Sequence, residues 1–80
     1  MKTIFLTYFA YLKDQSGIDQ ETIKTAANTL GELYGEIQVK YGIGLAVKDI
    51  KVAVNDHFTS LEERLCHGDR VVFIPPIAGG

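Results

Sequence analysis

The carboxyl end of the sequence has the residue types best suited to chemistry. Residues 73–80 are Phe-Ile-Pro-Pro-Ile-Ala-Gly-Gly. A terminal carboxylate has a pKa of about 3.3 to 3.7, so it is ionised at neutral pH and can attack the α-phosphate of a nucleotide. Gly79 and Gly80 lack a Cβ, which lets the backbone pass through a narrow channel at any φ. These residue types would suit a reacting carboxylate at Gly80, with Gly79 giving it access.

Two prolines precede this reactive end. Pro75 and Pro76 fix φ near −65° and favour an extended, polyproline-like segment. An extended segment over residues 75–80 reaches roughly 20 Å, at about 3.3 to 3.6 Å per residue. Preordering of this kind lowers the entropy lost when the segment binds a partner. We therefore expect residues 75–80 to form a functional tail that other proteins bind.

The strand before the tail is predicted over residues 70–74. Because side chains alternate along a strand, Val71 and Phe73 share one face while Val72 and Ile74 share the other. If a helix covers the first face, Val72 and Ile74 form an apolar stripe of the kind that marks protein interfaces. The alternative is that the chain's own loops cover them. The residues expected to bind a partner are Val72, Phe73, Ile74, Pro75, Pro76, Ile77 and Ala78.

Other reactive side chains have simpler structural interpretations. Cys66 and His67 are adjacent, so on a strand they point apart, and a turn glycine follows them. His57 and His67 are the only histidines, and no Cys/His set has zinc spacing, so we expect no metal site and no bound cofactor. Glu62 and Glu63 are interpreted as part of a solvated turn rather than as a catalytic pair.

The charge balance argues against a nucleic-acid partner. The formal net charge is −2, whereas proteins that bind nucleic acids usually have a basic face. The early aromatic residues are therefore expected to belong to the core rather than to a platform for stacking bases. These residues are Phe5, Tyr8, Phe9 and Tyr11.

The bulk properties describe one small domain. Eighty residues with 46% hydrophobic content support a single core, so we expect one domain over residues 1–80. No apolar run reaches the ~18 residues of a membrane span, and Lys13–Asp14 soon after the apolar start argue against a signal peptide. The single cysteine excludes an internal disulfide, so a cytoplasmic location is expected.

Residue periodicity predicts the order of the elements. β-branched and aromatic residues indicate a first strand over 3–9, apolar on both faces as in a central strand. About one helical turn is expected over 10–15, followed by a more polar edge strand over 21–26. The later predictions are a loop with a short edge strand over 43–50, strands over 51–55, 57–58 and 70–74, and a turn over 61–65.

The clearest helix begins after Thr29. Thr29 and Glu32 match a capping box, in which the threonine hydroxyl accepts the Glu32 amide and the Glu32 side chain reaches back. Gly42 suits the left-handed position after the helix. Gly31 and Gly35 lie inside the helix, where each lowers helix stability by roughly 1 kcal/mol relative to alanine. We interpret them as positions where a neighbouring element approaches the helix closely. The apolar face consists of Leu30, Leu33, Tyr34, Ile37 and Tyr41.

Together these elements predict the fold class. A lone helix after a hairpin covers one face of a sheet. The first and last strands are the most apolar, so we expect them to pair in parallel at the centre. The fold is predicted to be α+β with the β-grasp, ubiquitin-like arrangement: a mixed β-sheet, one main helix packed on one face and an extended carboxyl-terminal tail.

The sequence of the tail resembles the carboxyl-terminal signature of the small subunit of molybdopterin synthase, a family of ubiquitin-like sulfur carriers. The further matching segments are Tyr8–Ala10, Lys13–Asp14, Gly17, Val52–Asn55 and Gly68–Val71. The resemblance covers essentially the whole chain. It departs at His67, where the family usually has a polar or acidic residue, and over residues 43–50, which match nothing in the family.

This resemblance implies a sulfur carrier that is not itself catalytic. An adenylyltransferase similar to ubiquitin-activating enzymes would use ATP to adenylate Gly80, and a sulfur donor protein would convert the adenylate to a thiocarboxylate. The charged tail would then enter the active site of the large subunit of molybdopterin synthase. There it would give sulfur to cyclic pyranopterin monophosphate, a step in molybdenum cofactor biosynthesis.

Three other functions stay open at this point. A sulfur carrier for thiamine, cysteine or tRNA thiolation shares the Gly-Gly end but generally lacks Pro-Pro-Ile before it. A protein modifier would be joined through Gly80 to lysines of other proteins. A plain interaction domain would not need its tail.

Overall fold

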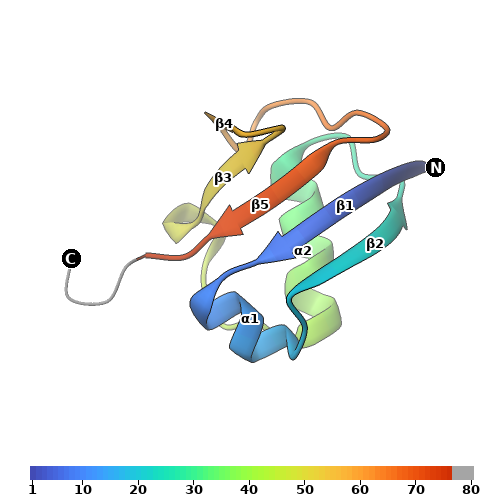
Figure 1. The fold of residues 1–80 in the computed structure, drawn as a ribbon. Helices are drawn as coiled ribbons and strands as arrows, with labels where there is room; N and C mark the ends of the chain where they lie inside the picture. Colours follow the sequence, from blue (N-terminus) through green and yellow to red (C-terminus); the bar gives the residue numbers. More distant parts are fainter. Residues whose placement is uncertain (77–80) are drawn as a thin grey trace.

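A mixed five-stranded sheet forms one layer of the molecule. The computed structural model describes residues 1–76, and the strands follow the order β2-β1-β5-β3-β4. The strands are β1 (Lys2–Tyr8), β2 (Gln20–Thr25), β3 (Lys51–Val54), β4 (His57–Thr59) and β5 (Arg70–Ile74). The helices are α1 (Ala10–Ser16), α2 (Leu30–Tyr41) and the 3-10 helix η1 (Val47–Asp49). Figure 1 shows α2 crossing one face of the sheet, which confirms the predicted β-grasp arrangement.

The first and last strands lie side by side, as predicted. β1 and β5 pair in parallel, with Leu6 opposite Val71 and Tyr8 opposite Phe73. β3 pairs antiparallel with the other side of β5, and β2 pairs antiparallel with β1. The central position of β5 means that the chain leaves the sheet from its middle.

Both ends of α2 confirm the capping prediction. The hydroxyl of Thr29 accepts a hydrogen bond from the Glu32 amide at 3.2 Å. The Glu32 side chain reaches back one residue further than in a standard capping box, because it accepts from the amide of Asn28. Gly42 has a φ of 63° and its amide donates to the carbonyl of Gln38. Within residues 1–76, no helix is long and apolar enough to cross a membrane.

Only one of the two helix glycines lies close to a neighbour. The amide of Gly31 donates to the carbonyl of Leu61 at 2.8 Å, and a Cβ built on Gly31 would lie 3.2 Å from that oxygen. A Cβ on Gly35 would meet nothing within 4 Å. The predicted close approach is confirmed for Gly31 and wrong for Gly35.

The core lies between α2 and the sheet. β1 contributes alternate residues to it, and β5 contributes Val71 and Phe73, both fully buried. Burying a side chain of this size stabilises the fold by about 1.5 to 3 kcal/mol. The buried apolar residues are Ile4, Leu6, Tyr8, Leu12, Ala27, Leu30, Leu33, Tyr34, Ile37, Ile43, Ile50, Val52, Leu65, Val71 and Phe73.

Three of the early aromatic residues are not in the core. Phe5 is 46% exposed, Phe9 51% and Tyr11 44%, and only Tyr8 is buried. Strand alternation turns Phe5 to the face that α2 does not cover. β1 ends at Tyr8, one residue earlier than predicted, and Phe9 becomes the residue before α1. The expectation that all four aromatic residues are core was therefore wrong.

The segment over residues 43–50 contains η1 and no strand, contrary to the expected edge strand. The carbonyl of Leu45 accepts hydrogen bonds from the Tyr34 hydroxyl at 2.7 Å and from the side-chain nitrogen Nε2 of Gln38 at 2.8 Å. Ile43 and Ile50, at its two ends, are buried. These contacts tie the segment to α2, so its backbone is not available to extend the sheet.

Candidate functional site

The tail begins at the centre of the sheet, next to the most buried part of the core. β5 ends at Ile74, Pro75 is buried and Pro76 is exposed, so the chain reaches the surface at Pro76. The ring of Phe73 meets Tyr34 edge-on with centroids 5.3 Å apart. The core thus fixes the point from which the tail starts.

The structure tests only part of the predicted site. Ile77, Ala78, Gly79 and Gly80 lie outside the described residues, so their roles stay predictions. Phe73 had been included among the residues that bind a partner, but it is fully buried. Strand alternation turns it toward α2, so it supports the strand and offers no surface to a partner.

The face of the sheet turned away from α2 has a row of paired residues across four strands, and the members from β5, β3 and β4 are apolar. Val72 of β5 pairs with Thr7 of β1 and with Ala53 of β3, and Ala53 pairs with Phe58 of β4. Val72 and Ile74 are half-buried, and Phe58 is 77% exposed. We call this the outer-face stripe, consisting of Phe5, Ala53, Phe58, Val72 and Ile74.

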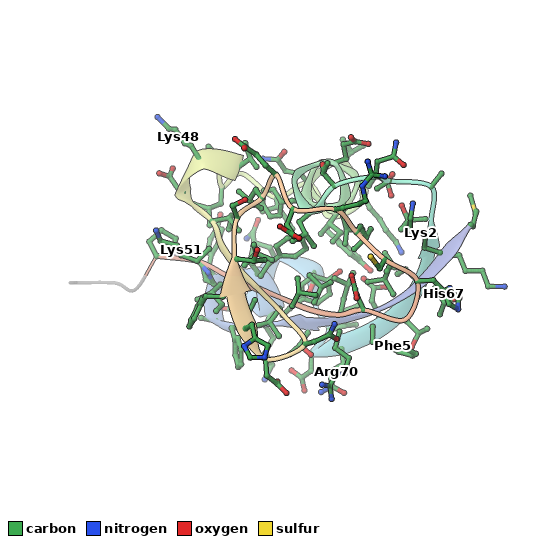
Figure 2. All side chains as sticks on the ribbon, turned by 90° about the horizontal axis from the view of Figure 1, so that it is seen from above. Lys2, Phe5, Lys48, Lys51, His67 and Arg70 are labelled. Atoms are coloured by element: carbon green, nitrogen blue, oxygen red, sulfur yellow. The ribbon has the colours of Figure 1, made fainter. Side chains whose placement is uncertain are left out.

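The burial pattern confirms the predicted division of β5 into a core face and an outer face. Figure 2 shows Phe5 and Arg70 together on the side of the sheet opposite α2, and the two residues are register partners. Sequence reasoning missed Phe5 and Phe58 as parts of this surface. The signal was present, because Phe5 alternates with the core residues Ile4 and Leu6.

A groove lies beside the tail, where α1 meets the end of β5. It has a volume of about 410 Å³ and is lined by Phe9, Ala10, Tyr11, Asp14, Ile74, Pro75 and Pro76. Ala10 has a φ of 47°, a value that residues with a Cβ rarely adopt. This turn takes the chain from β1 into α1 and leaves Phe9 and Tyr11 at the surface. Among the described residues that line the groove, only Asp14 has a charged side chain.

A half-buried carboxylate, that of Glu21, joins the sheet to α2 near the same end. The Tyr8 hydroxyl donates to Glu21 at 2.5 Å and the Tyr41 hydroxyl donates at 2.7 Å. Burial alone would raise the pKa of Glu21, but these two hydrogen bonds and nearby Lys40 outweigh it and hold that pKa below its ordinary value. Burial and the bond to Glu21 raise the pKa of Tyr8. The network supports the end of β1 that pairs with Phe73.

Cys66 and His67 lie at the opposite end of the sheet, where β1 begins. The ring nitrogen Nδ1 of His67 accepts from the Thr3 amide at 3.0 Å, and Asp69 accepts from the Cys66 amide at 2.8 Å. Gly68, which lies between His67 and Asp69, has a φ of 86°. Both contacts stabilise a turn. Within the described part of the chain, no group of three or more His, Cys, Asp or Glu side chains is placed to bind a metal.

Comparison with known proteins identifies the family. The model of the ThiS family matches residues 6–80. No curated protein matches the sequence. A solved chain from the complex of subunits 1 and 2 of molybdopterin-converting factor from Helicobacter pylori 26695 is 30% identical, with a TM-score of 0.65, and the match covers 98% of this chain and 99% of that one.

Two further solved structures have the same fold. A protein described as molybdopterin converting factor, subunit 1, from Pyrococcus furiosus is 26% identical over 96% of this chain and 100% of that chain, with a TM-score of 0.78. SAMP1 from Haloferax volcanii is 19% identical over 98% and 99%, also with a TM-score of 0.78, and shows the fold alone. Because the family model spans nearly the whole sequence, the chain belongs to the ThiS family of ubiquitin-like sulfur carriers.

Proposed function

We propose that this protein is the sulfur-carrying subunit of a molybdopterin synthase. The observation that supports this best is the 30% identity with a chain of the Helicobacter pylori molybdopterin-converting factor complex, over nearly the full length of both chains. The Phe-Ile-Pro-Pro-Ile-Ala-Gly-Gly sequence at the carboxyl end adds the reactive group. In this proposal the thiocarboxylate forms at Gly80 and the sulfur goes to cyclic pyranopterin monophosphate.

The proposed activation has three steps. A carboxylate oxygen of Gly80 attacks the α-phosphorus of ATP, and pyrophosphate leaves. The terminal sulfur of a donor persulfide then attacks the acyl carbon of the adenylate, and AMP leaves. A thiol then attacks the donor's sulfur in the resulting acyl disulfide; the thiocarboxylate leaves on Gly80, and the thiol and the donor cysteine are joined in a new disulfide. ATP consumption and a free cysteine, Cys66, suit a reducing cytoplasm.

The small domain contributes position rather than catalysis. Val71 and Phe73 are fully buried, which holds β5 in its place in the sheet, and the chain reaches the surface at Pro76. The outer-face stripe offers apolar surface next to the tail, where the large subunit or the adenylyltransferase docks. A rigid exit of this kind limits the positions that the terminal carboxylate can take, which favours productive geometry in the partner's active site.

Intact mass provides the test. The full chain is incubated with ATP, the adenylyltransferase and a persulfide donor from the same organism. We expect replacement of one oxygen by one sulfur, localised by fragmentation to Gly80. The product is then mixed with the large synthase subunit and cyclic pyranopterin monophosphate, and consumption of the thiocarboxylate should match dithiolene formation. Failure of the mass shift with an active enzyme set would contradict the carrier function.

A second candidate is a sulfur carrier for another pathway, which the match to the broader ThiS family supports. The same experiment separates the two candidates. A carrier for thiamine, cysteine or tRNA thiolation forms the thiocarboxylate but neither binds the large synthase subunit nor transfers sulfur to the pterin. A protein modifier instead gives isopeptide-linked products with lysines.

A further inference from the structure

The groove beside the tail contains a carboxylate with no cationic partner. Asp14 lies in α1, and within residues 1–76 no Lys, Arg or His nitrogen lies within 4.0 Å of its oxygens. Its neighbour Lys13 is already paired with Asp19 at 2.8 Å. Asp14 therefore lines the groove without a salt bridge among the described residues, and the electrostatic attraction of the neighbouring Lys13 is only a minor one.

One cation of the sheet, Lys51, lies on the other side of the tail exit. Lys51 of β3 pairs with Ile74 of β5, and Figure 2 shows Lys51 at the end of the sheet where residues 75–76 depart. β1, which leads into α1, lies on the opposite side of β5. Two strand spacings separate the backbones of β1 and β3 by about 10 Å. The base of the tail thus has Asp14 on one side and Lys51 on the other.

The remaining walls of the groove suit a long cationic side chain. Phe9 is 51% exposed and Tyr11 is 44% exposed. Aromatic faces attract cations within about 6 Å of the ring centroid, and the aliphatic stems of arginine and lysine pack well on apolar surfaces such as Pro75 and Pro76. A carboxylate can then bind the cationic head, with two parallel hydrogen bonds in the case of arginine.

The charge of Asp14 also argues against the chain's own tail as the occupant. If Gly80 ends in a carboxylate, as the proposed function requires, that carboxylate and Asp14 repel each other. A partner that grips the tail must pass beside Pro75 and Pro76, so its surface meets the groove. The adenylating enzyme is the partner that every sulfur-carrier pathway needs.

We propose that this groove is a docking subsite for an arginine or lysine side chain of the adenylating enzyme that takes up the tail. The proposal rests on the proposed function, since it requires a carrier whose tail is activated. It adds a specificity contact that uses Asp14, Phe9 and Tyr11 in addition to the outer-face stripe. It also sets the orientation of the enzyme relative to β5.

The test measures the dissociation constant between the full chain and the adenylating enzyme of the same organism, without ATP, at low and high salt. We expect Asp14→Asn to weaken binding about five- to tenfold and Asp14→Lys to weaken it by more than about tenfold at low salt. High salt should shrink both differences. Tyr11→Leu keeps the apolar surface but removes most of the cation–π attraction, so binding should weaken about threefold.

Glu62→Lys is the matched control, because it makes the same change of charge at the other end of the sheet. Glu62 is exposed and lies next to Leu61, whose carbonyl binds the start of α2. The dissociation constant of the Glu62→Lys variant should equal that of the unchanged chain. Asp14 is exposed in the last turn of α1, where a lysine is tolerated, and thermal unfolding checks that each variant is folded.

The outcomes separate the two proposals. If the unchanged chain binds and is adenylated, yet Asp14→Lys binds as tightly or more tightly, the subsite is wrong while the carrier function stands. If removal of residues 77–80 shifts the NMR resonances of Phe9 and Tyr11 in the free chain, the groove holds the chain's own tail and the proposal is also wrong. If the unchanged chain neither binds nor is adenylated by an active enzyme, the proposed function fails.

Discussion

Glu21 is the residue that ties α2 to the sheet near the tail exit. Its carboxylate, 15% exposed, accepts from Tyr8 and Tyr41 and lies 3.5 Å from the ammonium group of Lys40. Hydrogen bonds to a charged acceptor are stronger than neutral ones. Tyr8 is buried, so loss of its acceptor would remove the hydrogen bond that its hydroxyl makes within the protein.

Glu21→Gln should lower the free energy of unfolding by about 1 to 3 kcal/mol at neutral pH, because a neutral amide replaces the charged acceptor. The pKa of Glu21 is lowered in the folded state, so its contribution is full above the unfolded-state pKa of about 4.3 and is lost as the pH falls through the folded-state pKa. The difference between the two proteins should therefore shrink at about pH 3.5. Urea unfolding at both pH values measures this, with Glu62→Gln as the control; a constant difference would contradict it.

Gly80 is the residue on which the proposed chemistry depends. Deleting it moves the terminal carboxylate back by about 3.5 Å, and a misplacement of even about 1 Å can cost about a hundredfold in rate. We expect unchanged thermal unfolding and loss of sulfur transfer, measured as dithiolene formation with the large subunit. Retained activity in the shortened chain would rule out a carrier that reacts at Gly80.

At the scale of elements, α2 allows a matched comparison of its two glycines. Gly35→Ala places a methyl group in open space and should stabilise the protein by about 0.5 to 1 kcal/mol, the difference in helix propensity. Gly31→Ala gains the same propensity, but its Cβ would lie 3.2 Å from the carbonyl oxygen of Leu61. That backbone oxygen also binds the Gly31 amide, so it cannot move freely, and we expect no net gain. Urea unfolding of both variants checks this, and equal stabilisation would show that the contact with Leu61 is soft.

At the scale of the whole molecule, a single helix covers only one face of the sheet, so β5 has one face in the core and one face outside. Val72→Asp should keep the fold and weaken binding of the large subunit by at least about tenfold, because a charge enters the outer-face stripe. Val71→Asp, its neighbour on the core face, should unfold the protein, because it buries an unpaired carboxylate. Circular dichroism and titration calorimetry separate these effects. If the Val72→Asp variant is unfolded, Val72 belongs to the core and the prediction is contradicted.

Local patterns in the sequence predicted most of the elements. The capping residue Thr29, the left-handed Gly42 and the alternation of β5 are properties of a few neighbouring residues, and each is confirmed. The helical turn before β2 was also predicted, although α1 is one residue longer. Where neighbouring residues determine an element, the sequence was sufficient to predict it.

Predictions failed where contacts between distant residues decide the outcome. The segment over residues 43–50 packs against α2 because the side chains of Tyr34 and Gln38 donate hydrogen bonds to the carbonyl of Leu45. No pattern of neighbouring residues predicts these bonds. Phe9 and Tyr11 are exposed because the chain turns sharply at Ala10, whose positive φ is not typical of alanine. The role of Glu21 was likewise invisible, since its partners Tyr8 and Tyr41 come from other elements.

Patterns of consecutive residues were enough to predict the fold class and the family resemblance, and to single out Gly80 as a candidate reacting residue, because alternation, capping and the Pro-Pro-Ile-Ala-Gly-Gly segment are local features. The surroundings of residues 73–76 depend instead on packing between elements. It buried Phe73, left Phe5 and Phe58 on the open face, and brought Asp14 beside Pro75 and Pro76. The physical reason is that exposure depends on which elements pack together, and α2 is able to cover only one side of the sheet.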